Sequence, residues 1–299
     1  MKTSLFYQNV TVLDYAYLDD NYGLVGDALH VNVEFIGETD EEGILFDFSH
    51  AKKKVKSIID QICDHRCVLP KSALNIVDGK GKVHFNYGPN DTYLDYEAPL
   101  EAYCAIPYSH INKTTISSYL ETEILKEMPK NVKSVSIELT DEDKVQENPF
   151  FHYTHGLKDH YGNCQRLFHG HKNIVDIFVN GKKSPILEKK LCEDTFKGSI
   201  HFAYWENVQN KDEILNHINS SNFFGLHPEL PKVEIKYTSS QGEFSCQLPG
   251  REVFFLEIES TVENLSFIFA NIVKKWIDKS DKLEVRAYEG IAKGARTIL

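Results

Sequence analysis

The hydrophobic positions of the chain follow two periods, one typical of helices and one typical of strands. Apolar residues recur every three or four positions over residues 51–62, 114–128 and 262–276, and each pattern predicts an amphipathic helix. Ser260 and Glu263 have the spacing of a capping box at the start of the third helix. Runs rich in β-branched and aromatic residues predict strands at 30–36, 132–139, 173–179, 252–258 and 283–288.

The order of these elements indicates the fold class and the domain organisation. Hairpin strands followed by helices predict an α+β fold, with helices packed on one face of antiparallel sheets. The acidic segment TDEDKVQEN, residues 140–148, has the composition of a linker and lies between two parts of similar length. We therefore expect two domains, 1–143 and 149–299. Residues 88–108 and 199–250 are irregular, and we leave open whether they form lids, oligomer contacts or insertions.

Composition narrows the class of protein without identifying its function. Of the 299 residues, 41% are hydrophobic and 12% are aromatic, which suits a globular core. A net charge of −11 argues against nucleic acid as a partner, because binding phosphates needs a basic surface. The N-terminus lacks the apolar core of a signal peptide, and no apolar run reaches membrane length. The six cysteines do not show the spacing of a secreted scaffold, so we expect a cytoplasmic protein without a membrane partner.

Four residues of the second part have the types and the spacing of a metal centre with a nearby thiol. His169 and His171 lie two apart in an expected strand, so their imidazoles point to the same face. His155, from a preceding strand, would complete three nitrogen ligands with one open position, which is the ligand set of a catalytic zinc. Cys164 lies on the connection between them. Surface or core histidines are the alternative, since thirteen histidines make such a pair common by chance.

The pattern H…C-x4-HGH resembles that of the 6-pyruvoyl-tetrahydropterin synthase and 6-carboxytetrahydropterin synthase family, which are small T-fold enzymes. The resemblance implies that His155, His169 and His171 bind Zn²⁺ and that Cys164 is catalytic. Residues 43–70, GILFDFSHAKKKVKSIIDQICDHRCVLP, resemble the family segment whose Asp-His pair assists the cysteine. That likeness implies a catalytic role for Asp64 and His65; the alternative is a histidine favoured at a helix C-terminus.

Two shorter likenesses imply residues for substrate binding. STVENL at 260–265 resembles the family's PTAENL helix start, and VRAYE at 285–289 resembles its last strand. By this resemblance Glu289 anchors the pterin ring, and Thr261 lines the pocket. An ordinary surface carboxylate and a helix cap are the alternatives for these two residues.

The usual family member is about half as long as this chain, which therefore resembles a tandem duplication of the T-fold. Aligning Gly37 with Gly181 places four first-half residues opposite His155, Cys164, His169 and His171, in that order: Thr11, Asp20, Val25 and Asp27. The first half has thus lost the metal ligands and the thiol. Conversely, we set Asp64-His65 against Ile218-Asn219 in the second half, which lacks the pair.

Each half keeps what the other lacks, and this family builds its active site between subunits. We therefore expect two complementary degenerate halves that share one site; random decay after duplication is the alternative. Whether the Asp-His pair meets Cys164 within one chain or between chains stays open.

By this resemblance the protein is a zinc-dependent carbon–oxygen lyase. It would act on 7,8-dihydroneopterin triphosphate and form a 6-substituted tetrahydropterin, 6-pyruvoyl- or 6-carboxy-. Cys164 would remove a carbon-bound proton, and His65, oriented by Asp64, would transfer protons on the other side of the substrate. Two alternatives remain, a lyase or aldolase for another reduced pterin and a non-catalytic pterin-binding pseudoenzyme. We expect a homo-oligomer, as in the family.

Overall fold

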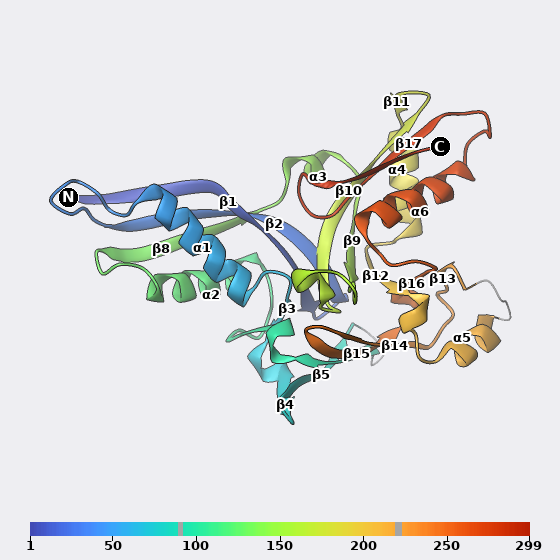
Figure 1. The fold of residues 1–299 in the computed structure, drawn as a ribbon, viewed down its shortest axis with the longest axis horizontal. Helices are drawn as coiled ribbons and strands as arrows, with labels where there is room; N and C mark the ends of the chain where they lie inside the picture. The colour runs from blue at the N-terminus through green and yellow to red at the C-terminus, as the bar shows by residue number, and fades with distance from the viewer. Residues whose placement is uncertain (89–91, 219–222) are drawn as a thin grey trace.

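In the computed structural model, residues 1–88, 92–218 and 223–299 are described, and they form three β-sheets flanked by helices (Figure 1). The first sheet lies within the first half of the chain. In the order β7-β3-β1-β2-β8, its strands span Tyr103–Ile106, Cys67–Pro70, Lys2–Asp19, Gly23–Glu38 and Val132–Thr140. β2 is antiparallel to β1 and β8, whereas β3 is parallel to β1 and β7.

The second sheet lies within the second half, and its central strands repeat the order of the first sheet. Its path is β13-β16-β12-β9-β10-β17-β18, and β11 pairs with β10 at the side. Along that path the strands span Gly225–Leu226, Val253–Leu256, Ser199–Tyr204, Phe150–His155, His169–Val179, Leu283–Tyr288 and Gly294–Ile298, with β11 at Lys182–Lys183. As in the first sheet, the strands around β12 are parallel. The expectation of antiparallel sheets holds for most strand pairs but not for those around β3 and β12, because a strand that returns after a crossover helix runs parallel to its neighbour.

The longest helices cover one face of each sheet, as expected. α1 (Phe48–Ile62) and α2 (Lys113–Lys126) bury apolar side chains against the first sheet, and α6 (Val262–Lys274) does so against the second. The shorter helices are α3 at Asp143–Glu147, which lies within the expected linker, α4 at Pro185–Lys189 and α5 at Lys211–Ile218. In the described part of the chain, no helix is long and apolar enough to cross a membrane.

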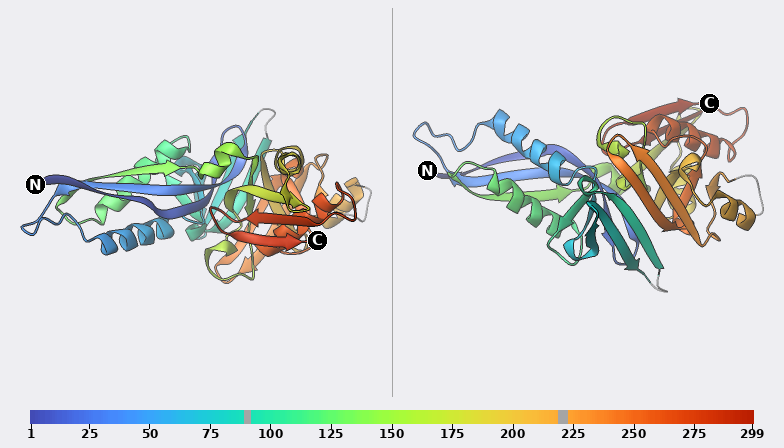
Figure 2. Two further views of the ribbon diagram at one scale, coloured as in Figure 1. Left: turned by 90° about the horizontal axis from the view of Figure 1, so that it is seen from above. Right: turned by 60° about the horizontal axis from the view of Figure 1, so that its bottom comes forward.

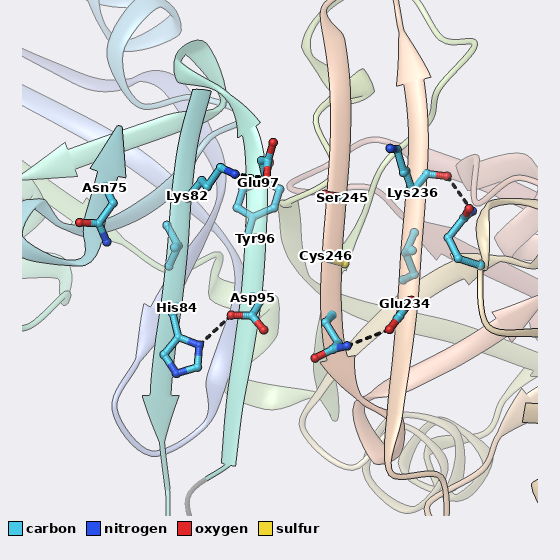
Figure 3. A pocket seen from close by; sticks show the side chains of 14 residues that line it. Asn75, Lys82, His84, Asp95, Tyr96, Glu97, Glu234, Lys236, Ser245 and Cys246 are labelled. Atoms are coloured by element: carbon cyan, nitrogen blue, oxygen red, sulfur yellow. Dashed lines mark hydrogen bonds and ion pairs between the residues drawn. The ribbon is translucent and has the colours of Figure 1, made fainter. Parts of the chain in front are cut away.

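The third sheet joins the two halves and was not expected. Its order is β14-β15-β6-β5-β4, with strands at Lys232–Ser239, Gly242–Pro249, Thr92–Pro99, Lys80–Tyr87 and Leu74–Val77. The second half contributes the hairpin β14-β15, and the first half contributes β4 and the hairpin β5-β6. The two hairpins pair where Tyr96 of β6 lies opposite Cys246 of β15 (Figure 3). These strands occupy much of the segments expected to be irregular, so that expectation was wrong. Beneath the sheet, Tyr96 stacks on Phe168 of the other half with ring centroids 4.1 Å apart.

A groove of about 510 Å³ lies on the third sheet between the two hairpins. Charged side chains line it, but several are already paired within their own hairpins, as Figure 3 shows. Lys82 binds Glu97 at 3.0 Å, and His84 binds Asp95 at 2.7 Å. None of the sequence-predicted site residues lines this groove.

The two halves also meet where their main sheets cross. Figure 2 shows the first sheet extending away from the second half and reaching it at one end. At the crossing, β2 lies so close to β9 and β10 that two glycines face each other: a Cβ added to Gly170 would lie 2.5 Å from the Cα of Gly26. A Cβ on Gly26 would lie 2.0 Å from the carbonyl oxygen of Tyr153. Only glycine permits this approach, and the candidate site lies beside it.

Candidate metal centre

Strand pairing in the second sheet brings the three predicted histidine ligands together. His155 of β9 lies directly opposite His169 of β10, and His171 follows two residues later on the same face. All three side chains are buried, each with 0% of its surface exposed. The ring centroids of His155 and His169 are 4.4 Å apart, and each lies 5.5 Å from that of His171. One nitrogen from each ring lies within 4.8 Å of the others.

Hydrogen bonds fix the tautomer of each ring. The Nδ1 atom of His155 lies 3.1 Å from the carbonyl oxygen of Ser260, and that of His169 lies 2.9 Å from the carbonyl oxygen of Arg166. For His171 the partner is the carboxylate Oδ1 of Asp14, at 3.2 Å. Carbonyl and carboxylate oxygens only accept, so each Nδ1 carries a hydrogen, which leaves Nε2 of the neutral ring with a lone pair.

The three Nε2 atoms are buried and have no hydrogen-bond partner among the described residues. A buried polar atom without a partner costs about 1–3 kcal/mol, so three in one place need an explanation. Burial lowers the pKa of His155 and His169 well below the usual value, and the neighbouring imidazoles lower it further. Both rings are therefore neutral, as metal ligands must be. Three imidazole Nε2 atoms aimed at one point fit a zinc ion with an open fourth position.

The predicted thiol and the Asp-His pair meet at this cluster within one chain. Cys164 lies in a 3₁₀ turn, Gly162–Gln165, and shares a hydrogen bond with His65 from the first half. The His65 ring stacks on that of His169 with centroids 5.3 Å apart. Side-chain nitrogen and sulfur atoms of His65, Cys164 and His169 form a second group within 4.8 Å that could hold a metal.

The Asp64-His65 pair is held rigidly against β1. The Nδ1 atom of His65 lies 2.6 Å from Oδ2 of Asp64. The other carboxylate oxygen of Asp64 accepts the backbone N–H of Asp14 at 3.0 Å, and the backbone N–H of His65 donates to the carbonyl of Asp14 at 2.7 Å. Burial alone would lower the pKa of His65, but its hydrogen bonds to Asp64 and Cys164 outweigh burial and raise the pKa to about 10. His65 is therefore an imidazolium at neutral pH.

The two predicted substrate-binding residues lie at the edges of the site. Thr261 is the N-cap of α6 and accepts the backbone N–H of Asn264 at 3.3 Å, so the helix begins one residue later than the capping box predicted. Glu289 follows β17, and its carboxylate has no hydrogen-bond partner in the described part of the chain. Burial raises the pKa of Tyr153, and the Glu289 carboxylate raises it further. Because the Tyr153 ring lies 5.1 Å from that of His155, Glu289 is within electrostatic reach of the cluster.

Sequence reasoning missed four residues that position the site: Asp14, Arg166, Ser260 and Lys293. The hydroxyl of Ser260 lies 2.9 Å from Nδ1 of His155, in addition to the carbonyl contact, so this residue serves the metal centre rather than the helix cap. Arg166 donates to the carbonyl of His65 at 3.3 Å and so links the halves. Asp14 carried a detectable signal, because it is a lone carboxylate inside the apolar run VTVLDYA.

Matching the two sheets strand by strand gives the first-half counterparts of the site residues. β7 and β16 both begin four residues after a proline, at Tyr103 and Val253, each following a three-residue 3₁₀ turn. Tyr103 pairs with Cys67, which pairs with Ala16, and in the second sheet Val253 pairs with His201, which pairs with Thr154. If Tyr103 corresponds to Val253, then Ala16 corresponds to Thr154. One position further along, Tyr17 faces Val25 as His155 faces His169.

This matching agrees with the sequence alignment at two positions and differs from it at the others. Val25 and Asp27 occupy the positions in the first sheet that His169 and His171 occupy in the second. The position of His155 is occupied by Tyr17, not by Thr11. Asp20 is not the counterpart of Cys164, because β1 and β2 are joined by residues 20–22 alone, whereas residues 156–168 join β9 and β10. The counterpart of Asp64-His65 is Gly198-Ser199 rather than Ile218-Asn219, and Asn219 lies outside the described residues.

Comparison with known proteins finds only distant structural similarity. No protein-family model matches the chain, and no curated protein matches it. Among solved structures, it is similar to 6-pyruvoyltetrahydropterin synthase of Plasmodium vivax, with 21% identity and a TM-score of 0.38 over 48% of this chain and 93% of that one. For the Plasmodium falciparum enzyme the identity is 18% and the TM-score 0.39, over the same shares of the two chains. A TM-score this low carries no argument about function, which has to rest on the residues of the site.

Proposed function

We propose that the protein is a zinc-dependent carbon–oxygen lyase that acts on 7,8-dihydroneopterin triphosphate and forms a 6-substituted tetrahydropterin. One observation carries this proposal. Three buried, unpartnered imidazole nitrogens converge beside a thiol, and that thiol is hydrogen-bonded to an Asp-His pair from the other half. A binding protein without catalysis would need neither the thiol nor the oriented imidazolium.

The residues around the centre have separable roles in this proposal. Zinc would supply Lewis-acid polarisation of the hydroxyls on the substrate side chain, which acidifies the neighbouring C–H bonds. Cys164, hydrogen-bonded to His65, is the general base that accepts a carbon-bound proton. His65 returns a proton to the substrate, and Asp64 keeps its ring in place.

Recognition of the pterin ring falls to Glu289 in this proposal. Its carboxylate is uncommitted among the described residues, so it could accept paired hydrogen bonds from the amino group and ring N–H of a pterin. Thr261 is the weaker candidate, since its hydroxyl already caps α6. It would line the pocket without a hydrogen bond of its own.

We also propose that the chain is a tandem duplication whose halves meet near residues 143–149. The shared strand order β7-β3-β1-β2-β8 and β16-β12-β9-β10-β17 supports this, as do the matched hairpins of the third sheet. The first half lends Asp64 and His65, and the second half lends Cys164 and the three ligands. A fused pair then builds within one chain a site that the family builds between subunits. Assembly of such chains into a homo-oligomer remains part of the proposal.

Two measurements test the function. Zinc analysis of the purified protein should give about one ion per chain, and a protein that binds none would support a non-catalytic role instead. Incubation with 7,8-dihydroneopterin triphosphate should release triphosphate and a 6-substituted tetrahydropterin, whereas turnover of a different reduced pterin would favour the related lyase or aldolase.

A matched pair of variants tests the assigned base. Cys164→Ala should abolish turnover while zinc binding persists, because the thiol is not among the three imidazole ligands. Cys246→Ala changes a buried thiol in the third sheet and should leave turnover intact. A Cys164→Ala protein that still converts the substrate contradicts the assignment.

A further inference from the structure

Asp14 contacts residues of the candidate site from both halves of the chain, although no sequence motif points to it. It lies on β1 with 3% of its surface exposed. Its carboxylate Oδ1 is 3.2 Å from Nδ1 of His171, and its Oδ2 is 3.1 Å from Nζ of Lys293. Its backbone N–H and C=O bind Asp64 and His65, respectively. One residue thus touches a metal ligand and both members of the acid–base pair.

The contact with His171 differs in kind from those of the other two ligands. His155 and His169 donate to neutral oxygens of the second half, whereas His171 donates to a carboxylate from the first half. A carboxylate partner makes an imidazole a stronger metal ligand and fixes the orientation of its ring. Backbone packing confirms how closely the carboxylate is held, because a Cβ added to Gly290 would lie 2.3 Å from its Oδ1.

We propose that Asp14 is a positioning residue that couples the two halves of the site: it orients His171 as a metal ligand and anchors the Asp64-His65 pair beside it. The inference rests on the metal centre of the proposed function and goes beyond it. Without the carboxylate of Asp14, Nδ1 of His171 would lose its charged acceptor, and with it this link between a metal ligand and the first half. Lys293 balances the buried charge of the carboxylate.

The test compares three variants by zinc affinity, measured by chelator competition. Asp14→Asn keeps the shape and the backbone hydrogen bonds but loses the charge, so affinity should fall about 10-fold. Asp14→Ala also loses the acceptor, and the fall should approach about 100-fold. Lys293→Met leaves the carboxylate on His171, so affinity should stay within about 3-fold of wild type or increase.

Asp27→Asn is the matched control. Asp27 is a buried carboxylate of the same strand pair, 3.4 Å from the hydroxyl of Tyr15, and makes no hydrogen bond or ion pair with His155, His169 or His171. Its substitution tests whether loss of any buried carboxylate near the crossing weakens zinc binding. The control should bind zinc as wild type does.

A second readout needs neither metal nor substrate. In metal-free protein, ¹⁵N NMR of the histidine rings should show His171 with its hydrogen on Nδ1, and Asp14→Ala should lose that preference while His155 and His169 keep theirs. This readout remains available where a variant folds but binds zinc poorly for other reasons.

The outcomes separate this inference from the proposed function. Wild-type protein that binds no zinc overturns the metal centre itself. If wild type binds zinc but Asp14→Asn binds it equally well, the role of Asp14 is refuted and the metal centre stands. An equal loss in Asp27→Asn also refutes it, because that result would reflect general weakening of the interface.

Discussion

Substituting Gly26 by alanine tests whether the crossing of the two sheets builds the site. The added Cβ would lie 2.0 Å from the carbonyl oxygen of Tyr153 and 2.7 Å from the backbone nitrogen of His171. Both obstacles are backbone atoms of the strands that carry the ligands, so neither can rotate away. An ordinary carbon–oxygen contact needs about 3.3 Å, so the halves must separate by roughly 1 Å.

That separation determines how much stability, turnover and zinc affinity Gly26→Ala should lose. Overpacking of this kind costs about 1–3 kcal/mol, and two backbone obstacles place Gly26→Ala near the upper end. The separation also moves Asp14 and His65 relative to the ligands. A misplacement of about 1 Å lowers turnover on the order of 100-fold, and a displaced carboxylate partner weakens zinc binding about 10-fold.

Gly37→Ala is the control for destabilisation alone. Its Cβ would lie 2.1 Å from the carbonyl oxygen of Asn131, again a backbone atom, but this clash lies within the first half at the far end of β2. Urea unfolding of both metal-free variants should show similar losses of stability. Chelator competition should show weaker zinc binding in Gly26→Ala alone; equal affinities in the two variants would refute the role of the crossing.

The remaining predictions concern the ligands, the shared site and one buried carboxylate. Zinc at 100 times its Kd should stabilise the wild type by about 2.7 kcal/mol in thermal unfolding, and His155→Ala should remove that gain; a gain that survives would place the metal elsewhere. Mixed oligomers of His65→Gln and Cys164→Ala chains should show no turnover, because both residues serve one site within a chain, whereas recovered activity would show a site between chains. Burial raises the pKa of Glu259 to about 7, so the folded state is favoured while this group is protonated, and its contribution is lost as pH rises through 7. Glu259→Gln should therefore leave the free energy of unfolding unchanged at pH 4 and raise it at pH 8 by on the order of 1 kcal/mol, a value reduced because the carboxylate is partly exposed. An equal change in the free energy of unfolding at both pH values would contradict this.

The sequence predicted the local elements and the ligands because both depend on short-range spacing. The alternation of β10 and the HxH pair place two imidazoles on one face whatever the rest of the chain does. The helix stripes of α1, α2 and α6 are likewise local patterns, and their centres were right within a few residues.

The sequence did not predict how the halves join, because that depends on contacts between distant segments. The signal for the third sheet was nonetheless present, since KVHFNY at 82–87 and KVEIKY at 232–237 alternate in the same way and are each followed by a second strand that ends in proline. The gapless alignment failed at Cys164 because the connection between β9 and β10 is longer than that between β1 and β2. Asp14 was missed because its role depends on His171, 157 residues away.

The measurement closest to the central claim is X-ray absorption at the zinc edge of the loaded protein. Two overlapping groups could hold the ion, His155 with His169 and His171, or His65 with Cys164 and His169. We predict three imidazole nitrogens at about 2.0–2.1 Å and no sulfur. A sulfur ligand at about 2.3 Å would place the metal on Cys164 and contradict both the three-histidine centre and the role of the thiol as a base.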